Sequence, residues 1–398
     1  MARHMQQTWR YRTSIGLPCA LWFGAALAFA ASCAIAQAAG PPDRPVGDCS
    51  NLAPVGVFQE ITPPEIRASI DRNKNDGGSF AIAVDPINHG TVYVGTRSAK
   101  LWKTTDCGAT WTAIATGRLG ADVNRGMNWT LVVDPVEPNV VYTNSGYGAN
   151  GLFKSRNGGI DWDVIWPPPR QPELAKAFRY NFVNVLTINP QDRHHLLLTF
   201  HESCLPPNPV TCIGESKDGG ETWRLIRSTS QLQGGLGQVI YVLDNPQTWL
   251  WGSQFSGFWR TEDSGLTWQM IPGIRAGHYQ GSSIYRRQDG TFFLASVDGI
   301  WRSPDGRAAT WKLVPNTGPV VGGIVSDGNS IYASTCYMAG FCKKARLLVS
   351  AENDGLAWRE IAIPDQIAIG GTLAYDAKHR LLYSSNMIDG LWRMVVRP

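Results

Sequence analysis

Two aspartates, Asp298 and Asp389, stand in matching short phrases that read VDGI and IDGL. If both side chains lie on one rim of the fold, they are candidates for the acid and base of a glycoside hydrolase, which acts through a pair of carboxyl groups. Asp-Gly is also a favoured two-residue turn of a β-hairpin. The turn is the favoured interpretation, and catalysis by these two carboxyl groups is kept as the alternative.

A second group of side chains has the chemistry of a binding site for a polar ligand. Guanidinium groups pair with carboxylates, and aromatic rings with a few polar groups are typical of ligand sites. The predicted ligand-binding residues are Arg97, Arg125, Trp129, Arg179, Tyr180, His278 and Tyr279. Further candidates on the same expected loops are Asp76, Asn128, Tyr147, Asn150, Asn181, His201, Glu202, Gln238, Gln254 and Gln280. Each one alone is also consistent with an ordinary solvated loop residue, so the prediction depends on their grouping.

The elements that position these residues are marked by a recurring eight-residue phrase, [ST]-x-D-x-G-x-[ST]-W. We call its copies the box turns; they begin at Thr104, Ser216 and Thr261, with weaker copies at Ser155, Ser303 and Ala351. The Asp can accept backbone N–H bonds inside its own turn, and the Gly takes a conformation that a Cβ disfavours. The Trp can bury a large apolar surface between neighbouring repeats. We therefore interpret these aspartates as structural and not as catalytic.

Each box turn belongs to a repeat of four expected strands, and the tryptophans recur every 43 to 61 residues. This spacing is typical of propeller blades. A seventh set of strands, at 367–375, 381–385 and 391–396, has no box turn and is one strand short, and a strand at 55–62 can supply it. The prediction is an all-β fold: a seven-bladed β-propeller of four-stranded antiparallel blades over residues 55–398, closed by an N-terminal strand that completes the last blade.

The order of strands in a blade separates two faces. The turns between first and second strands and the box turns are expected on one face. The loops between second and third strands and the crossings between blades are expected on the opposite face, where the candidate residues lie.

The N-terminal segment predicts export. Arg3, Arg10 and Arg12 precede an apolar run that ends in an Ala-Gln-Ala cleavage site, so residues 1–38 are expected to be a signal peptide. An uncleaved membrane anchor is the alternative. Residues 39–54 are expected to be an exposed lead-in, and the chain to be periplasmic or secreted, with no membrane span after cleavage.

Charge and cysteines narrow the function further. The whole chain has 36 basic and 32 acidic residues, and without the three arginines of the signal segment 33 against 32 leave +1, so no nucleic-acid partner is expected. Six cysteines remain after cleavage, which favours disulfides in an exported protein. The natural pairs are Cys204–Cys212 and Cys336–Cys342, which leave Cys49–Cys107 as a latch on the ring. No metal-ligand spacing and no phosphate loop is found, and no cofactor or metal is expected.

The box turns and the rhythm of strands resemble the Asp-box, or bacterial neuraminidase repeat, of sialidase-like propellers over residues 55–398. Sialidases have six blades and an arginine triad that cannot be placed here. Xyloglucan-active endoglucanases, a more distant resemblance, use two seven-bladed propellers, whereas this chain has length for one. The photosystem II stability/assembly factor group, a single exported seven-bladed propeller, is most similar in size and layout. The resemblance to that group implies binding of a partner protein without catalysis. Together with the candidate binding residues, it predicts a monomeric binding propeller with a glycan or protein ligand; a glycoside hydrolase of the sialidase/xyloglucanase-like type is the alternative.

Overall fold

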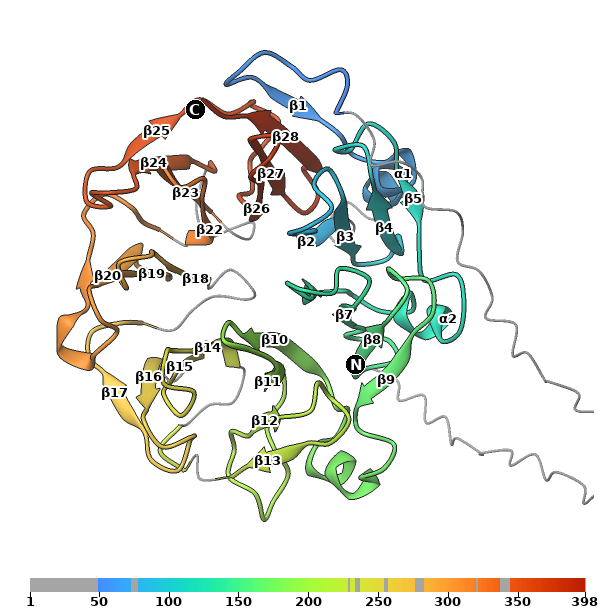
Figure 1. Ribbon diagram of the computed structural model, residues 1–398, viewed down its shortest axis with the longest axis vertical. Coiled ribbons are helices and arrows are strands. Elements are labelled where there is room, and N and C mark those ends of the chain that lie inside the picture. Colours follow the sequence, from blue (N-terminus) through green and yellow to red (C-terminus); the bar gives the residue numbers. More distant parts are fainter. Residues whose placement is uncertain are drawn as a thin grey trace, which may run out of the picture. The chain divides into compact units, whose positions relative to one another are not determined.

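The computed structural model describes residues 49–72, 78–227, 230–232, 237–253, 257–275, 283–319, 321–336 and 344–397. Within these ranges the strands form seven four-stranded antiparallel sheets that stand as blades around a ring (Figure 1). The predicted seven-bladed β-propeller is therefore confirmed. The expected signal peptide, residues 1–38, lies outside the described residues.

The first three blades follow one another from β2 to β13, with the first strand of each blade nearest the ring axis (Figure 1). Blade 1 consists of β2 (Ser79–Val84), β3 (Val92–Thr96), β4 (Leu101–Thr104) and β5 (Thr112–Ala113). Blade 2 consists of β6 (Leu131–Val133), β7 (Val141–Asn144), β8 (Leu152–Ser155) and β9 (Asp163–Trp166). Blade 3 consists of β10 (Val183–Asn189), β11 (Asp192–Phe200), β12 (Ile213–Ser216) and β13 (Arg224–Ile226).

The remaining blades repeat the pattern up to the C-terminus. Blade 4 consists of β14 (Gly237–Val242), β15 (Trp249–Ser253), β16 (Gly257–Thr261) and β17 (Gln269–Ile271). Blade 5 consists of β18 (Ile284–Arg286), β19 (Phe292–Ala295), β20 (Ile300–Ser303) and β21 (Lys312–Leu313). Blade 6 consists of β22 (Val321–Ser326), β23 (Ser330–Thr335), β24 (Leu347–Ala351) and β25 (Arg359–Ile361). Blade 7 consists of β26 (Thr372–Asp376), β27 (Leu381–Ser385), β28 (Leu391–Val395) and β1 (Phe58–Glu60).

The two ends of the described chain close the ring in blade 7, as the sequence predicts. β1 pairs antiparallel with β28 in a register that places Phe58 opposite Met394 and Glu60 opposite Trp392. On the inside of the same seam β2 contacts β26, so blade 1 packs against blade 7. This pairing covers the edge strand that an open sheet would expose.

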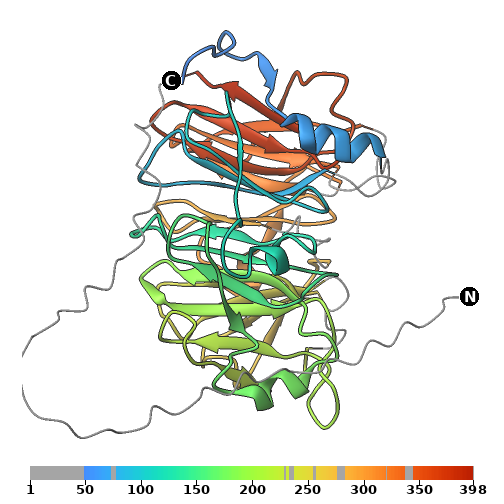
Figure 2. The same ribbon diagram turned by 90° about the vertical axis from the view of Figure 1, so that its right-hand side faces the viewer.

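The antiparallel order places the connections on two faces, which the side view separates (Figure 2). We call the face with the first-to-second turns and the box turns the turn face. The opposite face, with the second-to-third loops and the crossings between blades, is the crossing face.

The box turn at Asp218 shows how the repeated phrase works. The Asp218 carboxylate accepts hydrogen bonds from the Thr222 N–H at 2.9 Å, from the Thr222 hydroxyl at 2.5 Å and from the Ser216 hydroxyl at 2.8 Å. The Ser216 hydroxyl oxygen accepts in turn from the Gly220 N–H at 2.8 Å. The turns at Asp106 and Asp263 repeat these bonds. The carboxylates are therefore used inside their own turns.

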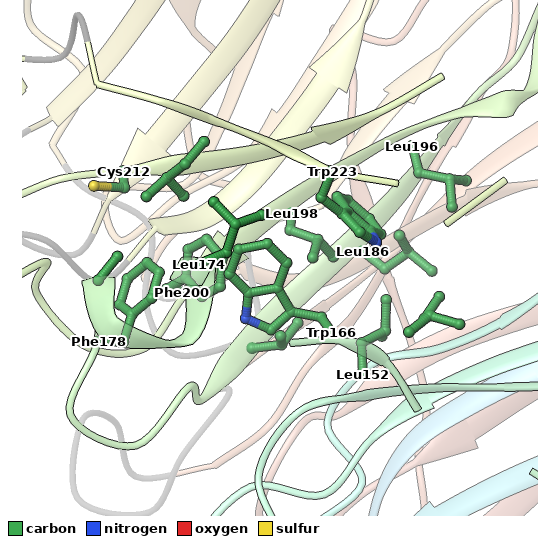
Figure 3. Close-up of a cluster of buried hydrophobic side chains, with 14 of the residues drawn as sticks. Leu152, Trp166, Leu174, Phe178, Leu186, Leu196, Leu198, Phe200, Cys212 and Trp223 are labelled. Carbon is green, nitrogen blue, oxygen red and sulfur yellow. The ribbon is translucent and has the colours of Figure 1, made fainter. Parts of the chain in front are cut away.

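The seams between blades hold the apolar core. At the seam of blades 2 and 3, Trp166 and Trp223 lie with ring centroids 5.8 Å apart, and Phe178 stacks on Phe200 at 4.1 Å (Figure 3). Burying one indole of this kind stabilises the fold by about 4 kcal/mol on the usual area coefficient. A basic side chain also crosses this seam: Lys154, on the third strand of blade 2, donates a hydrogen bond to the Gly219 carbonyl of blade 3 at 2.9 Å.

A helix between β1 and β2 is the main element that the sequence prediction missed. α1 (Pro64–Arg72) buries Ile66 and Ile70, one helical turn apart, in the core at the seam of blades 7 and 1. The signal was present: Thr62-Pro63-Pro64-Glu65 fits a capping box with proline in the first turn. Shorter turns of helix are α2 (Gly120–Val123), η1 (Pro172–Ala177) and η2 (Ala308–Thr310).

The predicted disulfides agree with the structure where it describes them. Cys49–Cys107 joins the segment before β1 to the first box turn, with a Cα–Cα distance of 5.3 Å, and Cys204–Cys212 closes a crossing-face loop at 6.1 Å. Cys336 is also disulfide-bonded, while its expected partner Cys342 lies outside the described residues. No helix in the described ranges has the length and apolarity to span a membrane.

Candidate functional site

Four aromatic side chains gather on the crossing face at the seam of blades 2 and 3. We call them the ring cluster: Trp129, Tyr147, Phe182 and His201. Trp129 lies 5.5 Å from Tyr147 and 5.2 Å from His201 between ring centroids, both in edge-to-face geometry. Phe182 stacks on His201 at 4.5 Å with an interplanar angle of 18°. Such contacts fix the rings relative to one another.

The blade topology explains why residues from four separate segments meet here. Trp129 belongs to the crossing that leads into β6, and Tyr147 to the β7–β8 loop of the same blade. Phe182 is the last residue of the crossing into β10, and His201 follows β11 directly. Because crossings and second-to-third loops share one face, neighbouring blades bring these four positions together.

The backbone of the β7–β8 loop is shaped for this contact. A Cβ on Gly146 would lie 2.3 Å from the Phe182 ring, so only glycine allows the ring to approach. Tyr147 has a φ of 56°, the left-handed conformation, which disfavours a bulky residue by about 1–2 kcal/mol. Its side chain is nevertheless 63% exposed. Backbone strain around an exposed aromatic ring is a feature found at ligand sites.

A carboxylate holds the crossing that carries Phe182. Glu202 accepts hydrogen bonds from the Tyr180 N–H at 3.0 Å and from the Phe182 N–H at 2.9 Å. Tyr180 itself is largely exposed, and the Arg179 guanidinium lies 5.9 Å from its ring centroid. Two predicted binding residues, Arg179 and Tyr180, thus lie within three residues of Phe182 along the chain.

The histidine of the cluster is uncharged at neutral pH. Burial among the rings lowers the pKa of His201 to about 4, because the site stabilises the charged imidazolium poorly. The cluster therefore presents an aromatic surface without a cation of its own.

The ring cluster adjoins a cavity of about 210 Å³ on the ring axis, which the inner strands line. Trp129 contributes to both the cluster and this cavity. The other polar lining side chains are Thr130, Gln238, Ser283 and Thr372. The three hydroxyl groups also bond inside the fold: Thr130 accepts from the Leu186 N–H at 3.2 Å, Ser283 accepts from the Ile324 N–H at 2.9 Å, and Thr372 donates to the Phe80 carbonyl at 2.9 Å.

The two candidate catalytic aspartates lie in different blades. Asp298 is in the β19–β20 loop of blade 5, and Asp389 is in the β27–β28 loop of blade 7, with blade 6 between them. Asp298 accepts a 2.6 Å hydrogen bond from Arg275 Nε, and its side chain is 15% exposed. Asp389 accepts backbone N–H bonds at 2.8 and 2.7 Å from residues 368 and 369. Each carboxylate thus binds the crossing beside its own loop.

Burial also affects the acidity of Asp389. Burial raises the pKa of Asp389, although the two backbone N–H donors oppose that shift. A raised pKa is what a general acid needs. The catalytic assignment of Asp298 and Asp389 stays a prediction.

The remaining predicted binding residues are spread over the crossing face. The Arg97 N–H donates to the Gly78 carbonyl at the mouth of blade 1. The Arg125 guanidinium pairs with Asp122 at 2.8 Å in α2. The candidates Asp76, Gln254, His278, Tyr279 and Gln280 lie outside the described residues. Of the candidates, Trp129, Tyr147 and His201 therefore form the one group that ring contacts join in the described ranges.

Phe182 is the cluster member that the sequence analysis missed. Its neighbours Arg179, Tyr180 and Asn181 are polar or amphipathic and are among the predicted residues, whereas a phenylalanine beside a strand is typical of the core. A useful signal was its position as the last crossing residue before β10, on the same face as the named candidates.

Two larger hollows, of about 480 and 500 Å³, lie on the turn face. The two arginines at the first one are paired with carboxylates. Arg193 contacts Asp134 at 3.2 Å and Glu137 at 2.7 Å, and Arg156 contacts Glu221 at 2.7 Å. Because these charges are compensated, we place the candidate site at the ring cluster.

One group of potential metal ligands occurs among the described residues, at the seam of blades 7 and 1. It comprises Cys49, Cys107 and His379, whose ligand atoms lie within 4.8 Å of one another. The two sulfurs are joined as a disulfide in the structure. This group lies on the turn face, away from the ring cluster.

Comparison with known proteins agrees with the fold. No family model matches the chain. It is similar to a xyloglucanase of Paenibacillus sp, with 25% identity over 267 residues that cover 62% of this chain and 21% of that protein. The solved GH74 xyloglucanase of Xanthomonas campestris superimposes with a TM-score of 0.57 at 16% identity, over 85% of this chain and 53% of that structure. YCF48 bound to D1 peptide superimposes with a TM-score of 0.57 at 14% identity, over 88% of this chain and all of YCF48.

These likenesses differ in what they cover. The chain spans about a fifth of the Paenibacillus xyloglucanase and about half of the Xanthomonas structure. It spans the full length of the YCF48 structure. At these identities the structural likeness shows the fold, a β-propeller with GH74 xyloglucanase and YCF48 neighbours.

Proposed function

We propose that the chain is an exported binding propeller that holds a saccharide on the ring cluster of the crossing face. The observation that carries the proposal is the ring cluster itself, in which Tyr147, 63% exposed, packs edge-to-face against the buried Trp129 and Phe182 and against His201. Rings held in place present flat apolar surfaces without losing conformational freedom on binding, and nearby hydroxyl and amide groups supply orientation.

Two further observations support this reading. Disulfides such as Cys49–Cys107 and Cys204–Cys212 persist in oxidising compartments, which is consistent with export by the expected signal peptide. The box turns carry the resemblance to Asp-box repeats. Their carboxylates accept hydrogen bonds from their own turns, as at Asp218, whereas the loops of the crossing face differ from blade to blade. The xyloglucanase similarity makes a polysaccharide the first ligand class to test.

The competing function is glycoside hydrolysis by Asp298 and Asp389. The raised pKa of Asp389 favours it, since a protonated carboxyl group is required for acid catalysis. The engagement of Asp298 by Arg275 and the placement of the two residues two blades apart favour binding without turnover. A protein segment on the ring cluster is the other binding mode, as the YCF48–peptide structure suggests.

The test is a calorimetric titration of the full chain with xyloglucan oligosaccharides and a wider glycan panel. Replacing Tyr147 with alanine is expected to weaken binding about fivefold, because one stacked ring contributes on the order of 1 kcal/mol. Leu266→Ala is the matched control, since Leu266 is 64% exposed but lies in a box turn on the turn face. Equal losses in both variants, or no glycan binding at all, would contradict the proposal.

The hydrolase and the protein-binding hypotheses predict different outcomes when the same protein and glycans are tested. Turnover of a bound glycan that vanishes in both Asp298→Asn and Asp389→Asn would establish the hydrolase. Displacement of bound glycan by extended peptides, with loss of peptide binding in Tyr147→Ala, would show that a protein segment shares the ring cluster.

A further inference from the structure

The seam that closes the ring contains a second cluster with its own chemistry. Asp376, at the end of β26, is fully buried and lies between two histidines. Its carboxylate oxygens are 2.9 Å from His89 Nδ1 and 2.8 Å from His379 Nδ1, and the Gly90 N–H donates to it at 2.7 Å. The disulfide Cys49–Cys107 lies beside His379 in the same cluster.

The shared carboxylate fixes the tautomer of both rings. An ionised carboxylate only accepts hydrogen bonds, so Nδ1 of each histidine carries the proton and Nε2 carries the lone pair. This arrangement, in which an acidic residue orients a histidine through Nδ1, is the usual outer support of a metal-binding imidazole. His379 is also partly exposed, which leaves a path for an ion to reach it.

The space among these groups is kept open by a glycine. Gly90 has a φ of +82°, and a Cβ there would lie 3.1 Å from Cys107 Sγ, 3.6 Å from Cys49 Sγ and 3.6 Å from the His379 ring. The two sulfurs and the imidazole therefore converge on one point of the backbone.

We propose that reduction of Cys49–Cys107 converts this latch into a Zn²⁺ site formed by the two thiolates and Nε2 of His379, with Asp376 as the positioning residue. Two thiolates and one imidazole are a ligand set that zinc prefers, and a water can complete the tetrahedron. The metal then takes over the connection between the segment before β1 and the first box turn.

The chemical steps balance. A phosphine reductant gives two electrons to the disulfide and becomes the phosphine oxide by taking the oxygen of one water molecule, whose two protons give two thiols. Zinc binding then releases the two thiol protons as both S–Zn bonds form.

The experiment uses the full chain, reduced with a phosphine that is then removed, and titrated with Co²⁺ as the spectroscopic probe. Thiolate ligation gives an intense charge-transfer band in the near ultraviolet, which Zn²⁺ should abolish by competition. Cys49→Ser/Cys107→Ser should lose this band. Cys204→Ser/Cys212→Ser, which removes the same number of cysteines elsewhere, should keep it.

The histidines supply the sharper comparison, because both bind Asp376 but only His379 belongs to the ligand group. His379→Gln is expected to lower the affinity for Zn²⁺ by 10- to 100-fold or more, and His89→Gln by less. Equal affinities in the two glutamine variants would overturn the proposal, as would a band that survives in Cys49→Ser/Cys107→Ser. Loss of the near-ultraviolet circular dichroism of the reduced chain in the presence of Zn²⁺ would also overturn it, since the site requires a closed ring.

Discussion

The two faces of the ring connect the same strands, but the turns on one face repeat from blade to blade and the loops on the other do not. On the turn face, the box turns at Asp106, Asp218 and Asp263 repeat the same hydrogen bonds, and their polar groups satisfy one another. On the crossing face, each loop has its own length and composition, and one seam carries the exposed ring of Tyr147 against the buried ring of Trp129.

This difference separates stability from recognition. A carboxylate that already accepts hydrogen bonds inside its own turn has few acceptor positions left for a ligand. The crossing face has side chains whose contacts hold a surface in place while part of it stays exposed. The comparison predicts that substitutions on the turn face change the free energy of unfolding, and that substitutions in the ring cluster change binding.

The largest change in the free energy of unfolding is expected from removing the disulfides, of which one lies on each face. Cys49–Cys107 closes a loop of 58 residues and Cys204–Cys212 one of 8. The chain-entropy relation gives losses of about 4 and about 2.5 kcal/mol for the paired serine variants. Urea unfolding measures both. A larger loss for the crossing-face pair would contradict the role of Cys49–Cys107 as the latch of the ring.

A smaller loss of stability is expected for Asp218→Ala, about 1–2 kcal/mol, because the Thr222 N–H and the Ser216 hydroxyl lose their acceptor. Lys217→Ala, an exposed neighbour in the same turn, is the control and should stay within about 0.5 kcal/mol of the parent. Thermal unfolding together with glycan titration checks the comparison. Loss of binding in Asp218→Ala at full folding would mean that the turn face takes part in recognition.

The same turn should be acid-sensitive. Burial alone would raise the pKa of Asp218, but hydrogen bonds from Thr222 and Ser216 hold it below the ordinary value. A lowered pKa in the folded state means that this stabilisation is complete above the unfolded pKa, near 4, and is lost as the pH falls through the folded pKa. The difference in stability between the parent and Asp218→Ala should therefore narrow only below about pH 4.

The ring cluster is expected to lose stability in acid as well, but over a different pH range. The pKa of His201 is about 4 in the folded state, below the ordinary value of 6.5, so the unfolded chain binds more protons between these two values. The stability contributed by His201 is present above about pH 6.5 and declines toward pH 4. His201→Phe should remove that decline, whereas Phe182→Leu, which alters the same cluster but removes no titratable group, should keep it. Thermal midpoints across pH 4 to 8 decide between them.

The candidate site was only partly predictable. Trp129 is one of the predicted binding residues, and Tyr147 and His201 are among the further loop candidates. Phe182 was missed because its residue type favours a core position. The contacts among the four rings depend on how closely blade 3 packs against blade 2. They also depend on Gly146, because its lack of a Cβ leaves room for the Phe182 ring.

The sequence by itself determined the blade count and the closure by the segment at 55–62, because strands and turns that repeat along the chain are local patterns. The Cys49–Cys107 pairing followed by elimination once the two pairs of nearby cysteines were assigned. Only the tertiary structure decided which loop residues meet. His379 stands far along the chain from Cys49 and Cys107, and no spacing between them indicates a shared site. Ring closure packs blade 7 against blade 1 and places all three within 4.8 Å, since proximity across a seam follows from packing and not from distance along the chain.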